Sequence, residues 1–167
     1  RLYLQNCSQC HGSDARGQRG FPNLTDNAWL YGGEPEAIVT TIRHGRIGQM
    51  PAWKDALGEQ GVKEVAAYVI SLSGRQVEPA LAEAGKAKFT MCVACHGSEG
   101  QGSLAATGLP LGAPALNDNI WLYGGSEKAV EASIRNGRAG VMPAWKDILG
   151  EEKVHVISAY VYSLSQD

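Results

Sequence analysis

The chain has no run of about eighteen apolar residues, so the sequence as given contains neither a membrane span nor a secretory signal peptide. It also lacks an excess of either charge, because 15 basic residues nearly balance 17 acidic ones and the formal net charge is −2. This balance argues against a nucleic-acid partner. A βαβ pattern and the alternation of half-buried strands are missing as well, which predicts an all-α fold.

Cysteine is scarce, and the four cysteines form two copies of Cys-x-x-Cys-His, namely Cys7-x-x-Cys10-His11 and Cys92-x-x-Cys95-His96. This pattern is typical of haem c attachment, in which both thiols bond to one porphyrin and the histidine coordinates the iron. A single copy would leave a thioredoxin-like pair, half a zinc site and a disulfide as alternatives. Two complete copies favour haem, since those alternatives leave both histidines unexplained. We therefore predict two covalent haems c per chain.

An internal repeat defines the domain organisation. Shifted by 92 positions, residues 29–75 align without a gap on residues 121–167, and 27 of the 47 pairs are identical. The cysteine motifs are offset by only 85, so the second copy carries seven additional residues in a loop before Gly112. The repeat predicts two small domains, residues 1–77 and 78–167, joined near Val77 where Gly and Pro interrupt the helical pattern. Neither could bury a large core alone, so each haem is expected to support folding.

Hydrophobic spacing predicts helices over residues 34–44, 61–73, 79–93, 127–136 and 153–165. Ser126 is the expected N-cap of the helix over 127–136. A full helix precedes the second cysteine motif, whereas only residues 1–6 precede Cys7. We therefore expect upstream sequence that is not included here, with the first domain's N-terminal helix truncated.

Met50 and Met142 are the candidate sixth ligands of the two irons. They occupy equivalent positions in the repeat, each within a Met-Pro-Ala-Trp segment that follows a helix-ending Gly-Arg pair. A soft thioether suits haem iron, and a filled sixth position favours electron transfer over ligand chemistry. We predict that His11 pairs with Met50 and His96 with Met142.

Other possible ligands do not recur in the repeat. His44 aligns with Asn136, and His155 aligns with Lys63, so neither histidine has an equivalent for the other haem. Met91 directly precedes a cysteine motif and is better placed to fill a gap in the core. Surface positions are expected for both histidines.

Further residues are candidates for the surroundings of each predicted haem. The carbonyls of Pro22 and Pro114 are candidates to accept the second ring proton of His11 and His96, because a ligating histidine generally donates its other nitrogen. Side chains that could bind the propionates or pack against the haem edge recur in both copies; ordinary core and loop roles are the alternative for Trp29, Tyr31, Arg46, Trp121, Tyr123 and Arg138.

With these residues in place, each half resembles a class I cytochrome c domain, with a helix, the cysteine motif, a Pro-x-Leu loop and a Met-Pro ligand before a final helix. More narrowly, segments 26–33 and 42–53, repeated at 117–125 and 134–145, resemble the two-haem subunit III of cbb(3)-type cytochrome c oxidases. The resemblance implies that the helix before Cys92 packs against Tyr160. Gly85 and Phe89 depart from the class I pattern, since they stand seven and three residues before Cys92 instead of eight and four.

The resemblance implies two tandem class I cytochrome c domains, each wrapped around one covalent haem. It further implies an electron relay with no bond chemistry of its own, between periplasmic cytochrome c donors and the mono-haem and catalytic oxidase subunits. The location implied is the periplasmic side of a bacterial inner membrane, with any membrane contact made only through an upstream anchor.

Three other functions stay open at this point. A freestanding dihaem cytochrome shuttle would have a cleavable signal peptide upstream, whereas the oxidase subunit would retain a hydrophobic helix. A dihaem peroxidase needs a displaceable sixth ligand, and two symmetric Met-Pro sites argue against one. A gas sensor would let CO or NO replace the methionine.

Overall fold

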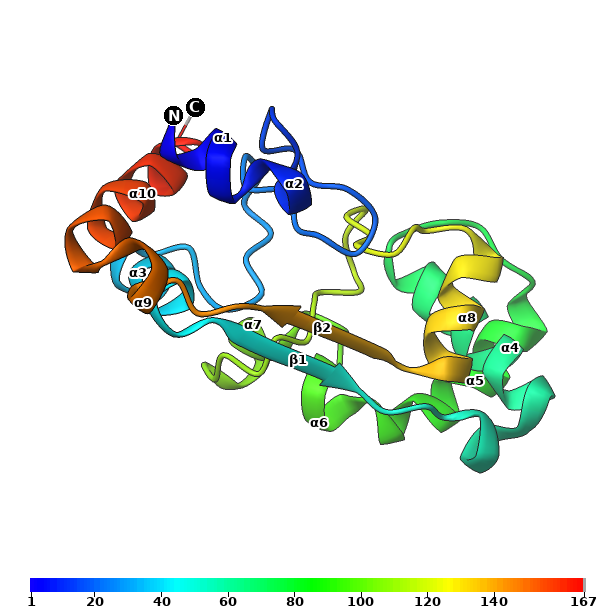
Figure 1. The fold of residues 1–167 in the computed structure, drawn as a ribbon. Coiled ribbons are helices and arrows are strands. Elements are labelled where there is room, and N and C mark those ends of the chain that lie inside the picture. Colours follow the sequence, from blue (N-terminus) through cyan, green and yellow to red (C-terminus); the bar gives the residue numbers. More distant parts are fainter. Residues whose placement is uncertain (167) are drawn as a thin grey trace. The chain divides into compact units, whose positions relative to one another are not determined.

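The computed structural model describes residues 1–166 as a mainly helical chain with two short strands (Figure 1). The expected all-α class is therefore confirmed, apart from the two-stranded sheet formed by β1 and β2. In chain order the elements are α1 (Leu2–Asn6), α2 (Ser8–His11), α3 (Pro35–His44), β1 (Arg46–Met50), α4 (Lys54–Leu72), α5 (Pro79–Lys88), the 3-10 helix η1 (Phe89–Met91), α6 (Val93–His96), α7 (Ser103–Thr107), α8 (Glu127–Asn136), β2 (Arg138–Met142), α9 (Lys146–Leu149) and α10 (Glu151–Ser163).

The sequence repeat is reproduced in the secondary structure. The helix expected over 127–136 is α8, and the predicted N-cap is confirmed, because Ser126 Oγ accepts a hydrogen bond from the Ala129 amide at 3.3 Å. The final helix of each copy is broken at a glycine. Gly58 lies inside α4 with φ +68°, and Gly150 lies between α9 and α10 with φ +78°, a region of backbone space that favours glycine.

Two expectations about the elements need correction. The helix expected over 79–93 ends at Lys88, and the chain then passes through η1 before α6 begins at Val93. The strands β1 and β2 were not expected, because each has only five residues and a glycine at its centre. So short a segment gives little alternation to detect from sequence.

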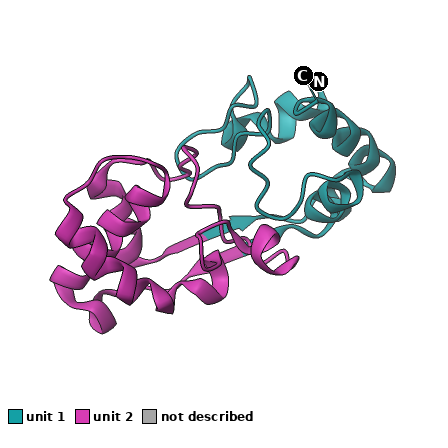
Figure 2. Ribbon diagram, turned by 180° about the vertical axis from the view of Figure 1, so that it is seen from behind, with its two compact units in different colours: residues 1–47, 140–167 teal, residues 48–139 magenta. Residues whose placement is uncertain are grey.

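The chain folds into two compact units that do not follow the two sequence repeats (Figure 2). Unit 1 contains residues 1–47 and the C-terminal segment from Gly140, and unit 2 contains residues 48–139. The bounds of these compact units differ from those of the two domains expected from the repeat, residues 1–77 and 78–167. The reason is that α4 packs against α5 and α8 of the second repeat, whereas α10 packs against α1 and α3 of the first.

The core of unit 2 forms around α4. Val62, Val65, Ala66 and Val69 are fully or almost fully buried, and their i, i+3, i+4, i+7 spacing gives α4 one continuous apolar face. This face packs against residues of the second repeat, namely Phe89, Val130 and Ile134.

The core of unit 1 is built in the same way from α10. Val154, Ile157 and Val161 are buried against Ile38 and Ile42 of α3, and Tyr3 of α1 completes the cluster.

The aromatic contact that precedes each cysteine motif also joins the two repeats. In unit 2 the Tyr68 and Phe89 rings meet edge to face, with centroids 5.1 Å apart. In unit 1 the Tyr3 and Tyr160 rings lie 5.6 Å apart. The helix before Cys92 therefore packs against Tyr68, the repeat equivalent of Tyr160, which corrects the contact that the class I resemblance implied.

Across residues 1–166, none of the helices is both long enough and apolar enough to cross a bilayer.

Candidate functional site

The second cysteine motif forms one short helical turn in unit 2. Cys92 is half-buried and caps α6, Cys95 is exposed, and His96 ends the helix with only 7% of its surface accessible. Burial, followed by the charge of Cys95, raises the pKa of the Cys92 thiol to about 11. The two thiols and the imidazole are thus carried by a single turn, as attachment to one porphyrin requires.

The first motif has the same local structure in unit 1. Cys7 caps α2, Cys10 is exposed, and His11 ends the helix. Burial also raises the pKa of the Cys7 thiol, with a further contribution from Cys10.

Each motif histidine donates a hydrogen bond to the carbonyl that the sequence indicated. His11 Nδ1 lies 2.9 Å from the oxygen of Pro22, and His96 Nδ1 lies 2.9 Å from the oxygen of Pro114. A carbonyl only accepts, so Nδ1 carries the proton and the lone pair of Nε2 is free to bind a metal. This is the arrangement of a ligating histidine whose ring is oriented by its surroundings. Burial lowers the pKa of His96, which also keeps the imidazole neutral.

The methionines are placed differently from the predicted pairing. In unit 2, Met50 packs against the core cluster that also contacts Cys92 and Trp121. In unit 1, Met142 packs against the cluster that contacts Cys7 and Trp29. The structure therefore groups Met50 with the second cysteine motif and Met142 with the first.

Arg138 forms part of a polar cluster in unit 2. Its Nε donates to Ser133 Oγ at 3.0 Å, and its guanidinium lies 4.5 Å from the centroid of the Tyr123 ring. One nitrogen, Nη2, is buried and has no hydrogen-bond partner among the described residues. A buried guanidinium nitrogen without a partner is costly unless an anion reaches it. A haem propionate has the required charge and hydrogen-bonding capacity, so this cluster fits the expected cofactor.

Unit 1 contains the equivalent cluster. Arg46 Nε donates to Thr41 Oγ1 at 2.9 Å, and its guanidinium lies 4.8 Å from the centroid of the Tyr31 ring. Burial raises the pKa of Tyr31, although the positive charge of Arg46 acts in the opposite direction.

The sequence interpretation missed the two hydroxyl residues and two glycines. Thr41 and Ser133 hold the arginines, and they align in the repeat as hydroxyl side chains five residues before each arginine, a pattern that could have identified them. A Cβ on Gly33 would lie 2.4 Å from the Trp29 ring, and one on Gly125 would lie 2.6 Å from the Trp121 ring. The Trp-Leu-Tyr-Gly-Gly segments thus need glycine so that the indoles can fold back on the chain.

The alternative iron ligands considered from the sequence lie at exposed positions. His44 and His155 are exposed, and Met91 is 39% exposed. In the part of the chain that the structure describes, no three side chains of His, Cys, Asp or Glu lie close enough to hold a metal ion.

Comparison with known proteins identifies the family. The family model described as "Cytochrome C oxidase, cbb3-type, subunit III" matches residues 1–69 and 80–161. The chain belongs to this family. Covalent haem c as the cofactor follows from this membership together with the cysteine motifs.

Curated relatives agree with this assignment. The chain is 49% identical to the cbb3-type cytochrome c oxidase subunit CcoP of Rubrivivax gelatinosus over 99% of its length and 53% of that protein. It is 43% identical to subunit FixP of Sinorhizobium medicae over 98% of this chain and 58% of that protein, and 40% identical to subunit CcoP of Azospirillum brasilense over 97% and 59%. The chain thus spans somewhat more than half the length of the curated relatives that it matches.

Proposed function

We propose that this chain is the electron-relay part of a cbb3-type cytochrome c oxidase subunit III. It carries two haems c, accepts electrons from periplasmic cytochromes c, and passes them to the mono-haem and catalytic subunits of the oxidase. It lies on the periplasmic side of the bacterial inner membrane and performs no bond chemistry. The family match, which covers both repeats, supports this function over the freestanding shuttle.

The observation that carries the proposal is the geometry of the two motif histidines. Each donates from Nδ1 to a proline carbonyl at 2.9 Å, which leaves Nε2 available beside a pair of cysteines on the same turn. Cys7, Cys10, Cys92 and Cys95 would hold the porphyrins, and Met50 and Met142 would each supply a thioether ligand to an iron. When bound, each haem supplies a one-electron Fe(II)/Fe(III) couple.

The residues around the sites serve to hold the cofactors rather than to react with a substrate. Arg46 and Arg138 would bind propionates, and the neighbouring tyrosines would cover the haem edges. A thioether from Met50 or Met142 bound to each iron would close it to small molecules and would raise its potential relative to a pair of histidines. A closed iron argues against peroxidase and gas-sensing functions.

The experiment uses the chain produced with its haem-attachment machinery. Intact mass is expected to show two covalent haems and no free thiol, and the ferric protein is expected to show the methionine-to-iron charge-transfer band at the intensity of two haems. Stopped-flow mixing with ferrous cytochrome c should then reduce both haems. Rapid CO binding to the ferrous chain at neutral pH, or an unmodified polypeptide, would contradict the proposal.

A further inference from the structure

We propose that the two haem sites exchange their methionine ligands between the sequence repeats, so that His11 shares its iron with Met142 and His96 shares its iron with Met50. This inference rests on the proposed function, because it assumes that both sites hold haem. It specifies which residue ligates which iron, and it replaces the pairing predicted from the sequence, in which His11 shares its iron with Met50 and His96 with Met142.

The first support is that backbone contacts around the methionines are reciprocal. The Trp53 amide, three residues after Met50, donates to the carbonyl of Ile134 at 3.0 Å in unit 2. The Trp145 amide, three residues after Met142, donates to the carbonyl of Ile42 at 3.0 Å in unit 1. Each Met-Pro-Ala-Trp segment is therefore fixed to the helix of the other repeat.

The close approach of each methionine backbone to a glycine of the other repeat supports the same exchange. A Cβ on Gly137 would lie 2.4 Å from the carbonyl oxygen of Met50, and a Cβ on Gly45 would lie 2.4 Å from that of Met142. Each methionine thus lies directly against the glycine that ends the other repeat's helix, α8 or α3.

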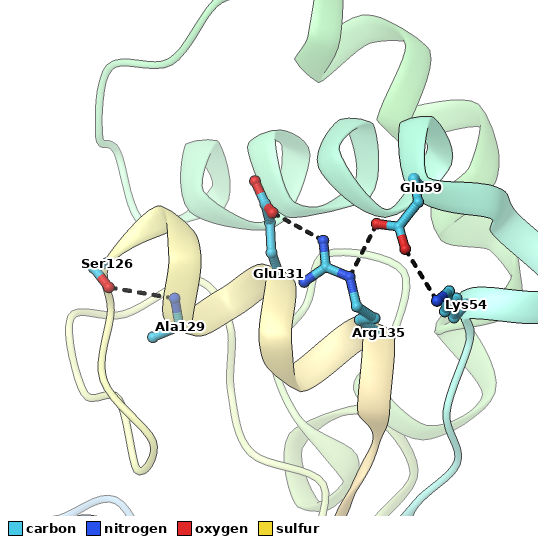
Figure 3. A network of polar contacts seen from close by, with 6 residues as sticks. All are labelled: Lys54, Glu59, Ser126, Ala129, Glu131 and Arg135. Carbon is cyan, nitrogen blue, oxygen red and sulfur yellow. Dashed lines mark hydrogen bonds and ion pairs between the residues drawn. The ribbon is translucent and has the colours of Figure 1, made fainter.

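Ion pairs follow the same exchange. Arg135 Nε lies 3.0 Å from Glu59 Oε2 in unit 2 (Figure 3), and Arg43 Nη2 lies 2.8 Å from Glu151 Oε2 in unit 1. Glu59 and Glu151 are equivalent in the repeat, so these pairs could also form within each repeat. They are consistent with the exchange but do not distinguish it from the unexchanged arrangement.

Two features that are not repeated do distinguish the arrangements. Only residues 73–78 connect α4 to α5, and the two helices pack directly against each other. A connection this short favours packing of consecutive helices as neighbours. Lys88 Nζ of α5 lies 2.6 Å from Glu64 Oε2 of α4, whereas the repeat equivalent of Glu64 is Val156. In an unexchanged fold Lys88 would face a valine and lose this partner.

The strands explain how the exchange is achieved. β1 leads from Arg46 in unit 1 to Met50 in unit 2, and β2 leads from Arg138 in unit 2 to Met142 in unit 1. Each strand therefore runs from the arginine expected to bind a propionate at one site, Arg46 or Arg138, to the methionine proposed as a ligand at the other site. A change that distorts one strand is expected to affect both haems.

The experiment assigns each methionine to one haem. In a C92A/C95A background, haem can attach only at the first motif, and the methionine-to-iron band of the ferric protein then reports that site alone. M142L and M50L are introduced separately into this background, with M91L as the control because Met91 belongs to neither proposed ligand pair. The reciprocal set uses a C7A/C10A background.

We expect M142L to abolish the band in the C92A/C95A background, whereas M50L and M91L keep it. The reverse result, with the band lost only in M50L, would overturn the exchange but leave the two-haem relay intact. A background with attached haem but no band would overturn the exchange and also the methionine ligation in the proposed function. Loss or retention of the band in both methionine variants alike would likewise overturn the exchange.

A second measurement leaves the cysteines and methionines of both haem sites unchanged. Carbodiimide treatment of the two-haem protein converts an adjacent lysine and carboxylate into an amide, and peptide mass spectrometry identifies the pair. The exchange predicts a Lys88–Glu64 cross-link within the monomer, which K88Q abolishes as the matched control. If intramolecular cross-links form elsewhere but Lys88 is never joined to Glu64, the exchange is refuted.

Discussion

Replacing Gly85 with alanine tests the tightest contact in the fold, the crossing of α5 and α4. A Cβ at this position would lie 1.9 Å from the carbonyl oxygen of Glu64 and 3.0 Å from the Tyr68 Cβ. Cβ atoms essentially never come closer than 3.0 Å to a heavy atom outside their own residue and its chain neighbours. The obstructing oxygen belongs to the backbone of a buried helix, so the two helices must separate.

The expected cost follows from two opposing terms. Overpacking of a close contact costs about 1–3 kcal/mol, and the severity of this contact places Gly85→Ala near the upper end. Alanine in place of glycine inside a helix raises the free energy of unfolding by about 1 kcal/mol. The net loss of about 2 kcal/mol should lower the melting temperature of unit 2 by roughly 10 °C.

Gly61→Ala is the matched control, because Gly61 lies on the α4 side of the same contact between α4 and α5. A Cβ there would meet only side-chain atoms, at 3.1 Å from the Leu57 Cβ and at 3.5 Å and beyond from the flexible Lys88 chain. We expect Gly61→Ala to be neutral or stabilising by up to about 1 kcal/mol. Guanidinium unfolding of the two-haem protein, followed by far-ultraviolet circular dichroism and haem absorbance, measures both variants. Equal stability of Gly85→Ala and the parent would refute the α4–α5 crossing.

Three further substitutions in unit 2 test separate parts of the structure. Ser126→Ala removes the cap on the Ala129 amide and should destabilise the unit by about 1 kcal/mol in the same unfolding assay. Arg138→Gln removes a positive charge that disfavours the ferric form, so potentiometric titration should show one midpoint potential lowered by roughly 20–60 mV. Arg135 lowers the pKa of Glu59 from 4.5, so their pairing stabilises the unit above that pH and is lost as pH falls through the lowered value. Arg135→Gln should therefore be less stable than the parent at neutral pH, and the difference should vanish in acid unfolding curves.

Local features of the fold were predictable because they depend on short stretches of chain. The Ser126 cap, the glycine-ended helices and the proline carbonyls that accept from His11 and His96 all follow from residue type and nearby sequence. The partner of the helix before Cys92 was not predictable in this way. Tyr68 and Tyr160 are identical residues in equivalent positions, so the repeat fits either one equally well.

Internal duplication itself made the pairing of the halves ambiguous. Two copies that share most of their contact residues can satisfy the same contacts within a repeat or between repeats, and the energy of those contacts barely distinguishes the two. What then decides is the connection, because a short link restricts the partner of each helix while a repeated contact does not. The six residues from 73 to 78 favour packing of α4 on α5, and the unrepeated Lys88–Glu64 pair at 2.6 Å acts in the same direction.

Lengthening this link with a flexible Gly-Ser insertion should therefore raise the share of protein in the unexchanged form, which loss of the Lys88–Glu64 cross-link would measure. If even a long insertion leaves the cross-link yield unchanged, then the core contacts distinguish the repeats after all, and the connection is not what decides between them.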